Sequence, residues 1–200
     1  MNRGRLGRLC TALGAVCVLL ALGLLLYNQM EELQARRITR EVAPALEQAI
    51  AQRVRQREAE PAPPQEEQTA EPEITLNGAV YLGFLSIPAL ELELPVRRDL
   101  TDGGLRLSPC RYAGSAEGGG LVIAAHNYRQ HFARLSALRQ GDLIRLTDAD
   151  GNVYDYAVAQ TETLDGGAVD DMTDSRWDLT LFTCTYGGKS RLTVRCMREK

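Results

Sequence analysis

Short apolar runs separated by turn residues fill the second half of the chain, and they limit its possible folds more than any other feature. Each run has the length of an ordinary strand, and Tyr154, Tyr156 and Val158 alternate with Asp155 and Ala157 as a half-buried strand requires. We therefore expect an antiparallel barrel or sandwich, with only two short helices, near 99–107 and 130–138. The runs are 81–87, 92–96, 121–125, 143–147, 153–160, 179–183 and 191–197.

The composition allows one globular domain with extensions. The 200 residues are 44% apolar and 24% charged, which is typical of a folded soluble domain. The formal net charge is -3, whereas phosphate binding normally requires a basic face. A nucleic-acid partner is therefore not expected.

The N-terminal segment has a different character. Residues 9–30 contain no charge and are long enough to cross the hydrocarbon core of a bilayer as a helix. Arg3, Arg5 and Arg8 precede this segment and favour a cytoplasmic N-terminus. No small-residue cleavage site follows directly, so we expect an uncleaved signal anchor rather than a signal peptide. Residues 1–28 are thus predicted to be a cytoplasmic tip and a single transmembrane helix in the cell membrane, with the rest of the chain outside.

Two further segments separate this anchor from the strand-rich region. Residues 29–58 are predicted to form a helical, membrane-proximal stalk that Pro44 interrupts or divides, and we expect it to act as a solvated spacer. Residues 59–73 are rich in Pro and Glu, so they cannot bury a core and are predicted to be an extended linker. A globular domain is left at 74–200. The stalk carries apolar residues spaced by four, namely Ile38, Val42, Leu46, Ile50 and Val54.

A cysteine and an arginine stand on either side of a short Gly-containing segment. Cys184 ends the run LTLFTC, and Arg191 opens the run RLTVRC after TYGGKS. Side chains two residues apart in a strand lie on the same face, so Phe182 and Cys184 share a face. Leu192 and Val194 are expected to face the core, which places Arg191 on the opposite face of its strand. If the two runs pair as a hairpin, Cys184 and Arg191 lie together at its closed end and point away from the core.

These residue types, with a histidine, supply the parts of a thiol-based acyl transfer. A cysteine thiolate is nucleophilic, and a histidine titrates near neutrality and serves as a general acid and base. His126, at the end of LVIAAH, is the histidine we assign, because His131 beside Phe132 suits a partly buried structural role. Arg191 keeps its charge and offers fixed donors for an oxyanion.

Some alternatives stay open at this point. Arg195 and Arg198 are alternatives to Arg191, although they fall later in the strand. Thr183 is assigned with equal weight to oxyanion support or to a core-facing strand position. A lone strand cysteine is ordinarily a small buried apolar residue, and only the combination of Cys184 with the other residues favours a nucleophile.

With these residues in that order, the chain resembles the sortases, cysteine transpeptidases of Gram-positive surfaces. The resemblance rests on TLFTC, on AAHN with its histidine, on the arginine that opens RLTVRC, and on YLGFLSIPALELELPV and HFARLSALRQGD. It covers roughly 74–200 and is closer to class B or class D members. It implies a closed β-barrel of about eight strands, with Cys184 as nucleophile, His126 as acid and base, and Arg191 as electrostatic clamp.

The resemblance also implies an activity. The enzyme would cleave a C-terminal LPxTG-like sorting signal of a surface protein, form a thioester, and transfer the protein to an amine of a cell-wall precursor or a pilin. Two other functions remain open: a non-catalytic anchored barrel that binds or assembles, and an exported thiol peptidase that only hydrolyses. Thiol labelling and amine-dependent product formation distinguish the three.

No metal or other cofactor is expected. CxxC, HxH and HExxH spacings do not occur in the sequence, and the acidic loop lacks the EF-hand pattern, so calcium is compatible with it but unsupported. Cys110 and Cys196 are expected to be buried thiols, although export would permit a disulfide between them. The acidic loop holds Asp165, Asp170, Asp171 and Asp174.

Overall fold

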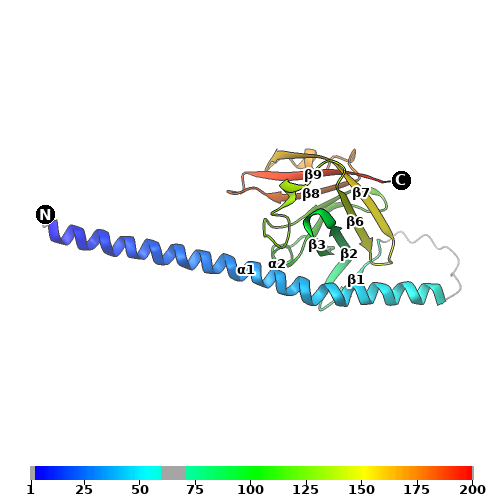
Figure 1. The fold of residues 1–200 in the computed structure, drawn as a ribbon, viewed down its shortest axis with the longest axis horizontal. Coiled ribbons are helices and arrows are strands. Elements are labelled where there is room, and N and C mark those ends of the chain that lie inside the picture. Colours follow the sequence, from blue (N-terminus) through cyan, green and yellow to red (C-terminus); the bar gives the residue numbers. More distant parts are fainter. Residues whose placement is uncertain (1–2, 60–70, 200) are drawn as a thin grey trace. The chain divides into compact units, whose positions relative to one another are not determined.

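A computed structural model describes residues 3–59 and 71–199. The chain divides into two compact units, Met1–Gln34 and Ala35–Lys200. Helix α1 (Arg3–Ala59) contributes to both units, and most of the expected linker lies outside the described residues. The later elements are β1 (Ile74–Leu76), β2 (Ala79–Ile87), η1 (Pro88–Leu90), β3 (Leu92–Arg97), α2 (Asp102–Leu107), β4 (Cys110–Ser115), β5 (Gly119–Ala124), η2 (Leu135–Ala137), β6 (Leu143–Asp148), β7 (Val153–Asp165), α3 (Val169–Met172), β8 (Leu179–Cys184) and β9 (Ser190–Arg198) (Figure 1).

The second unit is a closed barrel. The described strands follow the order β1-β2-β3-β4-β5-β8-β9-β7-β6, and a further pairing of β2 with β6 closes eight of them into a ring. Strand β1 pairs with β2 outside that ring. The fold is therefore mostly β with few short helices, as the sequence predicts. The barrel interior contains, among others, Leu85, Ile87, Leu94, Ile123, Phe132, Ile144, Tyr156, Leu181 and Val194.

The sequence pattern alone indicates an antiparallel ring, but two of the strand pairings are parallel. Strand β3 runs parallel to β4, and β5 runs parallel to β8. Parallel neighbours need a long crossover, and the connection from β5 to β8 contains β6, β7 and α3. The register pairs Val122 with Thr180 and Ala124 with Phe182. The carboxyl ends of β5 and β8 consequently meet at the same rim of the barrel.

Local sequence failed to predict four of these elements. Strands β1 and β4, the short η1 and helix α3 were not expected, while α2 and the short η2 fall inside the two predicted helical regions. In β4 the register shifts twice, and Gly114 adopts a φ of 68°. Such an irregular strand has no clean alternation to detect.

The seam that closes the barrel depends on a glycine. Gly83 of β2 pairs with Asp148 of β6 and has a φ of +147°. A Cβ at this position would lie 1.9 Å from the carbonyl oxygen of Thr147, far inside van der Waals contact. The strands can therefore approach closely enough to close the ring only where β2 carries no side chain.

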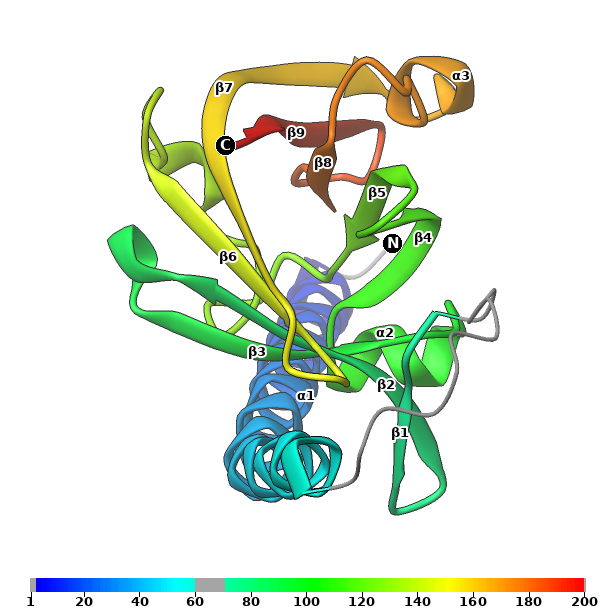
Figure 2. The ribbon, with the colours of Figure 1, turned by 90° about the vertical axis from the view of Figure 1, so that its right-hand side faces the viewer.

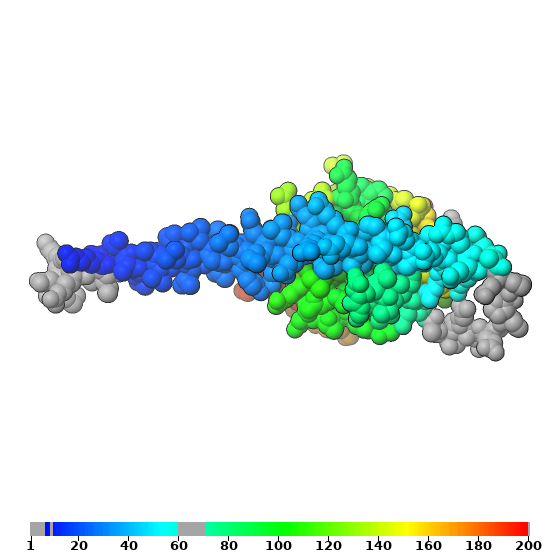
Figure 3. All heavy atoms as spheres, turned by 90° about the horizontal axis from the view of Figure 1, so that it is seen from below, coloured from blue at the N-terminus to red at the C-terminus, as the bar shows by residue number. Residues whose placement is uncertain are grey.

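The part of α1 that belongs to the second unit packs against the barrel. The expected stripe is confirmed, but it is buried rather than solvated. Leu46 has no exposed surface, and the stripe packs with Ala79 and Tyr81 of β2. Figure 3 shows this part of the helix lying along the barrel. A helix with one apolar face gains stability by covering apolar sheet surface, which the spacer hypothesis did not consider.

Polar contacts reinforce this packing. Arg53 Nη1 lies 3.3 Å from Asp150 Oδ1 and donates to the Glu73 carbonyl oxygen at 3.0 Å. Arg57 Nη2 lies 2.7 Å from Asp150 Oδ2. Pro44 does not interrupt the helix, because it lies on the exposed side, where water can satisfy the carbonyl that loses its donor.

Leu46→Ala is expected to lower the free energy of unfolding of residues 35–200 by about 2–4 kcal/mol, because it removes a fully buried side chain between helix and sheet. Urea denaturation measures this. Glu47→Ala, at the exposed neighbouring position, is the control and should change stability by less than about 0.5 kcal/mol. Equal effects of the two substitutions would contradict the packing of the helix on the barrel.

The first unit consists of the N-terminal part of α1. From Cys10 onward this helix contains an 18-residue window with a mean hydropathy of 2.4, none of it buried. Its length and composition meet the requirement for crossing a membrane, either as an anchor or as a signal sequence.

Candidate active site

Cys184 and Arg191 lie opposite each other at the closed end of the β8–β9 hairpin. The turn between them is held by backbone bonds: Thr185 N–H donates to the Ser190 carbonyl oxygen at 3.0 Å, and Gly188 N–H donates to the Thr185 carbonyl oxygen at 2.9 Å. Directly opposed residues in a hairpin project on the same face. The predicted hairpin and the predicted neighbourhood of these two residues are confirmed.

The two faces of β8 also follow the predicted alternation. Leu179 and Leu181 belong to the barrel interior, whereas Phe182 belongs to an outer cluster with Ala124 and Met172. Cys184 follows Phe182 on the outer face and is partly exposed. A reagent or substrate therefore reaches Cys184 from outside the barrel.

His126 reaches the same rim from the neighbouring parallel strand. The Ala125 N–H donates to the Phe182 carbonyl oxygen at 3.2 Å, so the next residue lies level with the end of β8. The His126 ring is partly exposed and stacks on Tyr128, with ring centroids 5.0 Å apart and planes 30° apart. The long crossover thus brings His126 to the rim at which β8 ends, 58 positions before Cys184 in the sequence, although His126 is not among the residues that line the groove beside Cys184.

The cysteine and the arginine both line a groove of about 210 Å³. Residues from α2 and β4 form one part of its lining, and residues from α3 form another. Tyr112 packs edge-on against Phe182 at its base, with ring centroids 5.3 Å apart. The lining residues are Leu100, Leu105, Tyr112, Ala124, Asp165, Gly166, Ala168, Val169, Met172, Phe182, Cys184 and Arg191.

Arg191 is the arginine that lines this groove. Its Nη1 donates to the carbonyl oxygens of Gly188 at 2.9 Å and Ser190 at 3.2 Å, which holds the side chain over the turn. Arg198 instead donates to the Ala116 carbonyl and lies over the Tyr154 ring, 4.8 Å from its centroid. Neither Arg198 nor Arg195 is among the groove residues, so these alternatives do not occupy the site.

Thr183 lies on the core-facing side of β8. It is 2% exposed, and its hydroxyl has no hydrogen-bond partner within residues 3–59 and 71–199. The groove lining does not include it. Of the two assignments that the sequence left open, this position matches the core-facing one.

His131, the other histidine, is buried in the barrel and does not line the groove. Its ring lies 5.6 Å from that of Tyr128, measured between centroids. Burial, with a smaller contribution from nearby His126, lowers the pKa of His131 to about 4. The side chain is therefore neutral in the folded protein at neutral pH, as a structural residue would be.

The low pKa of His131 predicts a loss of stability in acid. The unfolded chain binds a proton at this residue near pH 6.5, whereas the folded chain does so only near pH 4. Between these values protons favour unfolding, so the contribution of His131 should fall by about 3 kcal/mol as the pH drops from 6.5 to 4. Urea denaturation over this range should show a shallower pH dependence for His131→Phe. Identical slopes would contradict the prediction.

The remaining cysteines are poor competitors as nucleophiles. All five cysteines are free, so Cys110 and Cys196 form no disulfide. Burial raises the pKa of Cys110 to about 11 and that of Cys196 to about 12. Both stay protonated at neutral pH, because a thiolate is disfavoured away from water.

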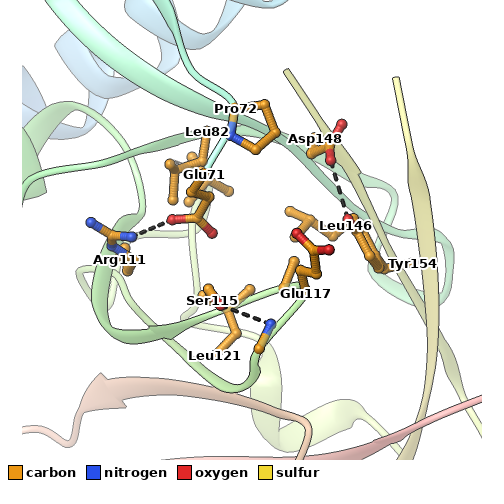
Figure 4. Close-up of a pocket in the computed structure, with 13 residues that line it drawn as sticks. Glu71, Pro72, Leu82, Arg111, Ser115, Glu117, Leu121, Leu146, Asp148 and Tyr154 are labelled. Atoms are coloured by element: carbon orange, nitrogen blue, oxygen red, sulfur yellow. Dashed lines mark hydrogen bonds and ion pairs between the residues drawn. The ribbon is translucent and has the colours of Figure 1, made fainter. Parts of the chain in front are cut away.

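A second cavity, of about 550 Å³, shares no lining residue with the groove at Cys184 (Figure 4). Several of its polar groups are paired: Glu71 with Arg111, and Asp148 with the Tyr154 hydroxyl at 3.3 Å. The residues that line it include neither a cysteine nor a histidine. It therefore offers neither a thiol nor an imidazole, and the groove at Cys184 is the candidate active site.

Comparison with known proteins places this arrangement in a family. Residues 85–199 match the model of the sortase domain. The chain belongs to the sortase family. Sortase A of Bacillus anthracis is 28% identical in an alignment 127 residues long, which covers 55% of this chain and 55% of that protein. The chain thus spans about half the length of this curated relative.

Solved sortase structures share the fold. Sortase C of Streptococcus pneumoniae is 24% identical, with a TM-score of 0.57 over 82% of this chain and 97% of that chain. Sortase A of Listeria monocytogenes is 23% identical, with a TM-score of 0.56 over 60% and 88%. A Clostridium perfringens sortase D5 transpeptidase is 20% identical, with a TM-score of 0.54 over 60% and 79%. These similarities extend across several sortase types.

Two features of the site were not predicted from sequence. Tyr128 stacks on His126, and its position two residues after the histidine is the only local signal for that contact. Helix α3 forms part of the groove lining, although its sequence VDDM lies in a loop that was expected to be solvated and acidic.

Proposed function

We propose that this sortase is a membrane-anchored cysteine transpeptidase that acts on a C-terminal LPxTG-like sorting signal. The observation that carries the proposal is the strand register. It sets Cys184 opposite Arg191 in the lining of one groove and brings His126 to the same rim from the parallel strand. A nucleophile, a proton carrier and a fixed cation then surround one position for a peptide carbonyl.

In the first half-reaction the Cys184 thiolate attacks the scissile carbonyl carbon, and the tetrahedral intermediate carries its negative charge on oxygen. Arg191 stabilises this oxyanion with a cation that does not lose its proton. The C–N bond breaks as His126 gives a proton to the departing amine. The product is a thioester between Cys184 and the N-terminal part of the substrate.

The second half-reaction resolves the thioester. An amine of a cell-wall precursor or a pilin attacks the thioester carbonyl and loses its proton to His126. Collapse of the intermediate forms the new amide bond and expels the Cys184 thiolate. The cycle is redox-neutral and needs no cofactor. In this assignment residues 9–30 anchor the chain in the membrane with the N-terminus in the cytoplasm, and the barrel faces outward.

The test uses residues 35–200, because the helix from Ala35 to Ala59 covers apolar surface of the barrel. Mass spectrometry would follow a library of sorting-signal peptides incubated with several acceptor amines. We expect an acceptor-linked product. Hydrolysis alone would indicate a thiol peptidase. No cleavage, together with a Cys184 that resists a small alkylating reagent, would indicate a non-catalytic binding module.

A further inference from the structure

A buried arginine connects the groove lining to the barrel. Arg195 of β9 is 2% exposed, although arginine is rarely buried without partners. Its Nε donates to Glu162 Oε1 of β7 at 2.6 Å, and Nη1 donates to Thr180 Oγ1 of β8 at 3.0 Å. The remaining donors go to α3: Nη1 to the Met172 carbonyl oxygen at 3.2 Å, and Nη2 to the Asp171 carbonyl oxygen at 2.5 Å.

These contacts give α3 a support that it cannot supply itself. The helix has only four residues, so no following helical turn supplies donors to its last carbonyl groups, those of Asp171 and Met172. A cation at the C-terminal end of a helix satisfies those carbonyls and interacts favourably with their dipoles. The planar guanidinium reaches both carbonyls and both strands at once, which a lysine ammonium cannot do with fixed geometry.

The supported helix forms part of the groove. Ala168, Val169 and Met172 line it together with Cys184, and Met172 packs in the outer cluster with Phe182. Figure 2 shows α3 in the connection between β7 and β8. A shift of α3 would therefore change the shape of the groove, while Cys184 keeps its place on β8.

We propose that Arg195 is a positioning residue that fixes α3 and thereby sets the shape of the substrate groove. The inference rests on the proposed transpeptidase function for its effect on substrate, but the support of α3 stands on geometry alone. Arg195 acts through α3 on substrate binding and takes no part in the bond-making steps.

The test compares Arg195→Met and Arg195→Lys with Arg176→Gln in residues 35–200. Arg176 lies in the same β7–β8 connection, but its side chain is 82% exposed, so it is the matched control. Hydrogen exchange of residues 166–178 should rise about tenfold or more in Arg195→Met and less in Arg195→Lys, and it should stay unchanged in the control. KM for the peptide should rise about tenfold, with kcat within about threefold.

Two results would overturn the proposal. One is unchanged exchange of residues 166–178 in a folded Arg195→Met protein. The other is a fall in kcat with KM unchanged. If Arg195→Met does not fold, Arg195→Lys keeps the charge in place and carries the same comparison. A wild-type chain with a protected α3 but no peptide turnover would refute the proposed function and leave the support of α3 intact.

Discussion

Replacing Cys184 with alanine is expected to abolish transpeptidation, with a fall of about 10⁴-fold or more in kcat/KM. The substitution removes the sulfur that forms the thioester in the proposed mechanism, and no other cysteine within residues 35–200 can take its place. Cys110 and Cys196 are buried and protonated, and neither lines the groove. Mass spectrometry of residues 35–200 with peptide and amine should show neither a linked product nor an acyl-enzyme mass.

Cys110→Ser is not a suitable control, because it would place a hydroxyl in a fully buried site. Met197→Ala serves instead, since Met197 lies on the same hairpin as Cys184 and is 44% exposed. This variant should keep its activity within about threefold. A Cys184→Ala protein that folds and still forms the acceptor-linked product would refute the assignment of the nucleophile.

The parts of the fold that depend on local pattern could be predicted from the sequence. Alternation of apolar residues located most strands, and the parity of β8 and β9 correctly placed Cys184 opposite Arg191. The spacing of the α1 stripe also correctly indicated a helix. In each case the signal spans a few residues, where side-chain direction follows directly from backbone geometry.

The parts that depend on distant contacts could not be predicted in this way. The parallel pairing of β5 with β8 joins segments that are separated by two strands and a helix, and alternation is blind to strand direction. The cover over the apolar face of β2 comes from residues that precede the barrel and read equally well as a spacer. An apolar face on a helix indicates that the face is buried, but it does not indicate which surface covers it.

The same distinction runs through the site. Cys184 and Arg191 are neighbours through a short turn, so local geometry brings them together. His126 reaches the same rim only through the crossover, and its assignment rests on its residue type, on the poorer fit of His131 and on the resemblance to the sortases. Arg195 was considered as an alternative to Arg191, and nothing in RLTVRC indicates that it is buried against α3. Burial separates the two arginines, and burial is a property of the whole fold.

His126→Gln is expected to reduce kcat/KM for a peptide substrate by about 10²- to 10⁴-fold, because glutamine cannot carry a proton to the departing amine. An ester of an acidic alcohol in place of the scissile amide should recover much of the acylation rate. The alkoxide of an alcohol with a low pKa leaves with little need for a proton. The same ester should not rescue Cys184→Ala. Burst kinetics with the two substrates would separate acylation from resolution by the amine.

The chain contains two histidines, which supplies the control. His131→Phe changes the buried ring and leaves the groove rim intact, so at neutral pH its activity should stay within about threefold of the wild type. If His126→Gln lost activity equally on amide and ester, the residue would be positioning the substrate rather than moving a proton. If the ester restored the activity of Cys184→Ala to the same extent, bond cleavage would not pass through the thiol. An alanine side chain cannot form the thioester, and the proposed proton transfers of His126 accompany the formation and resolution of that thioester.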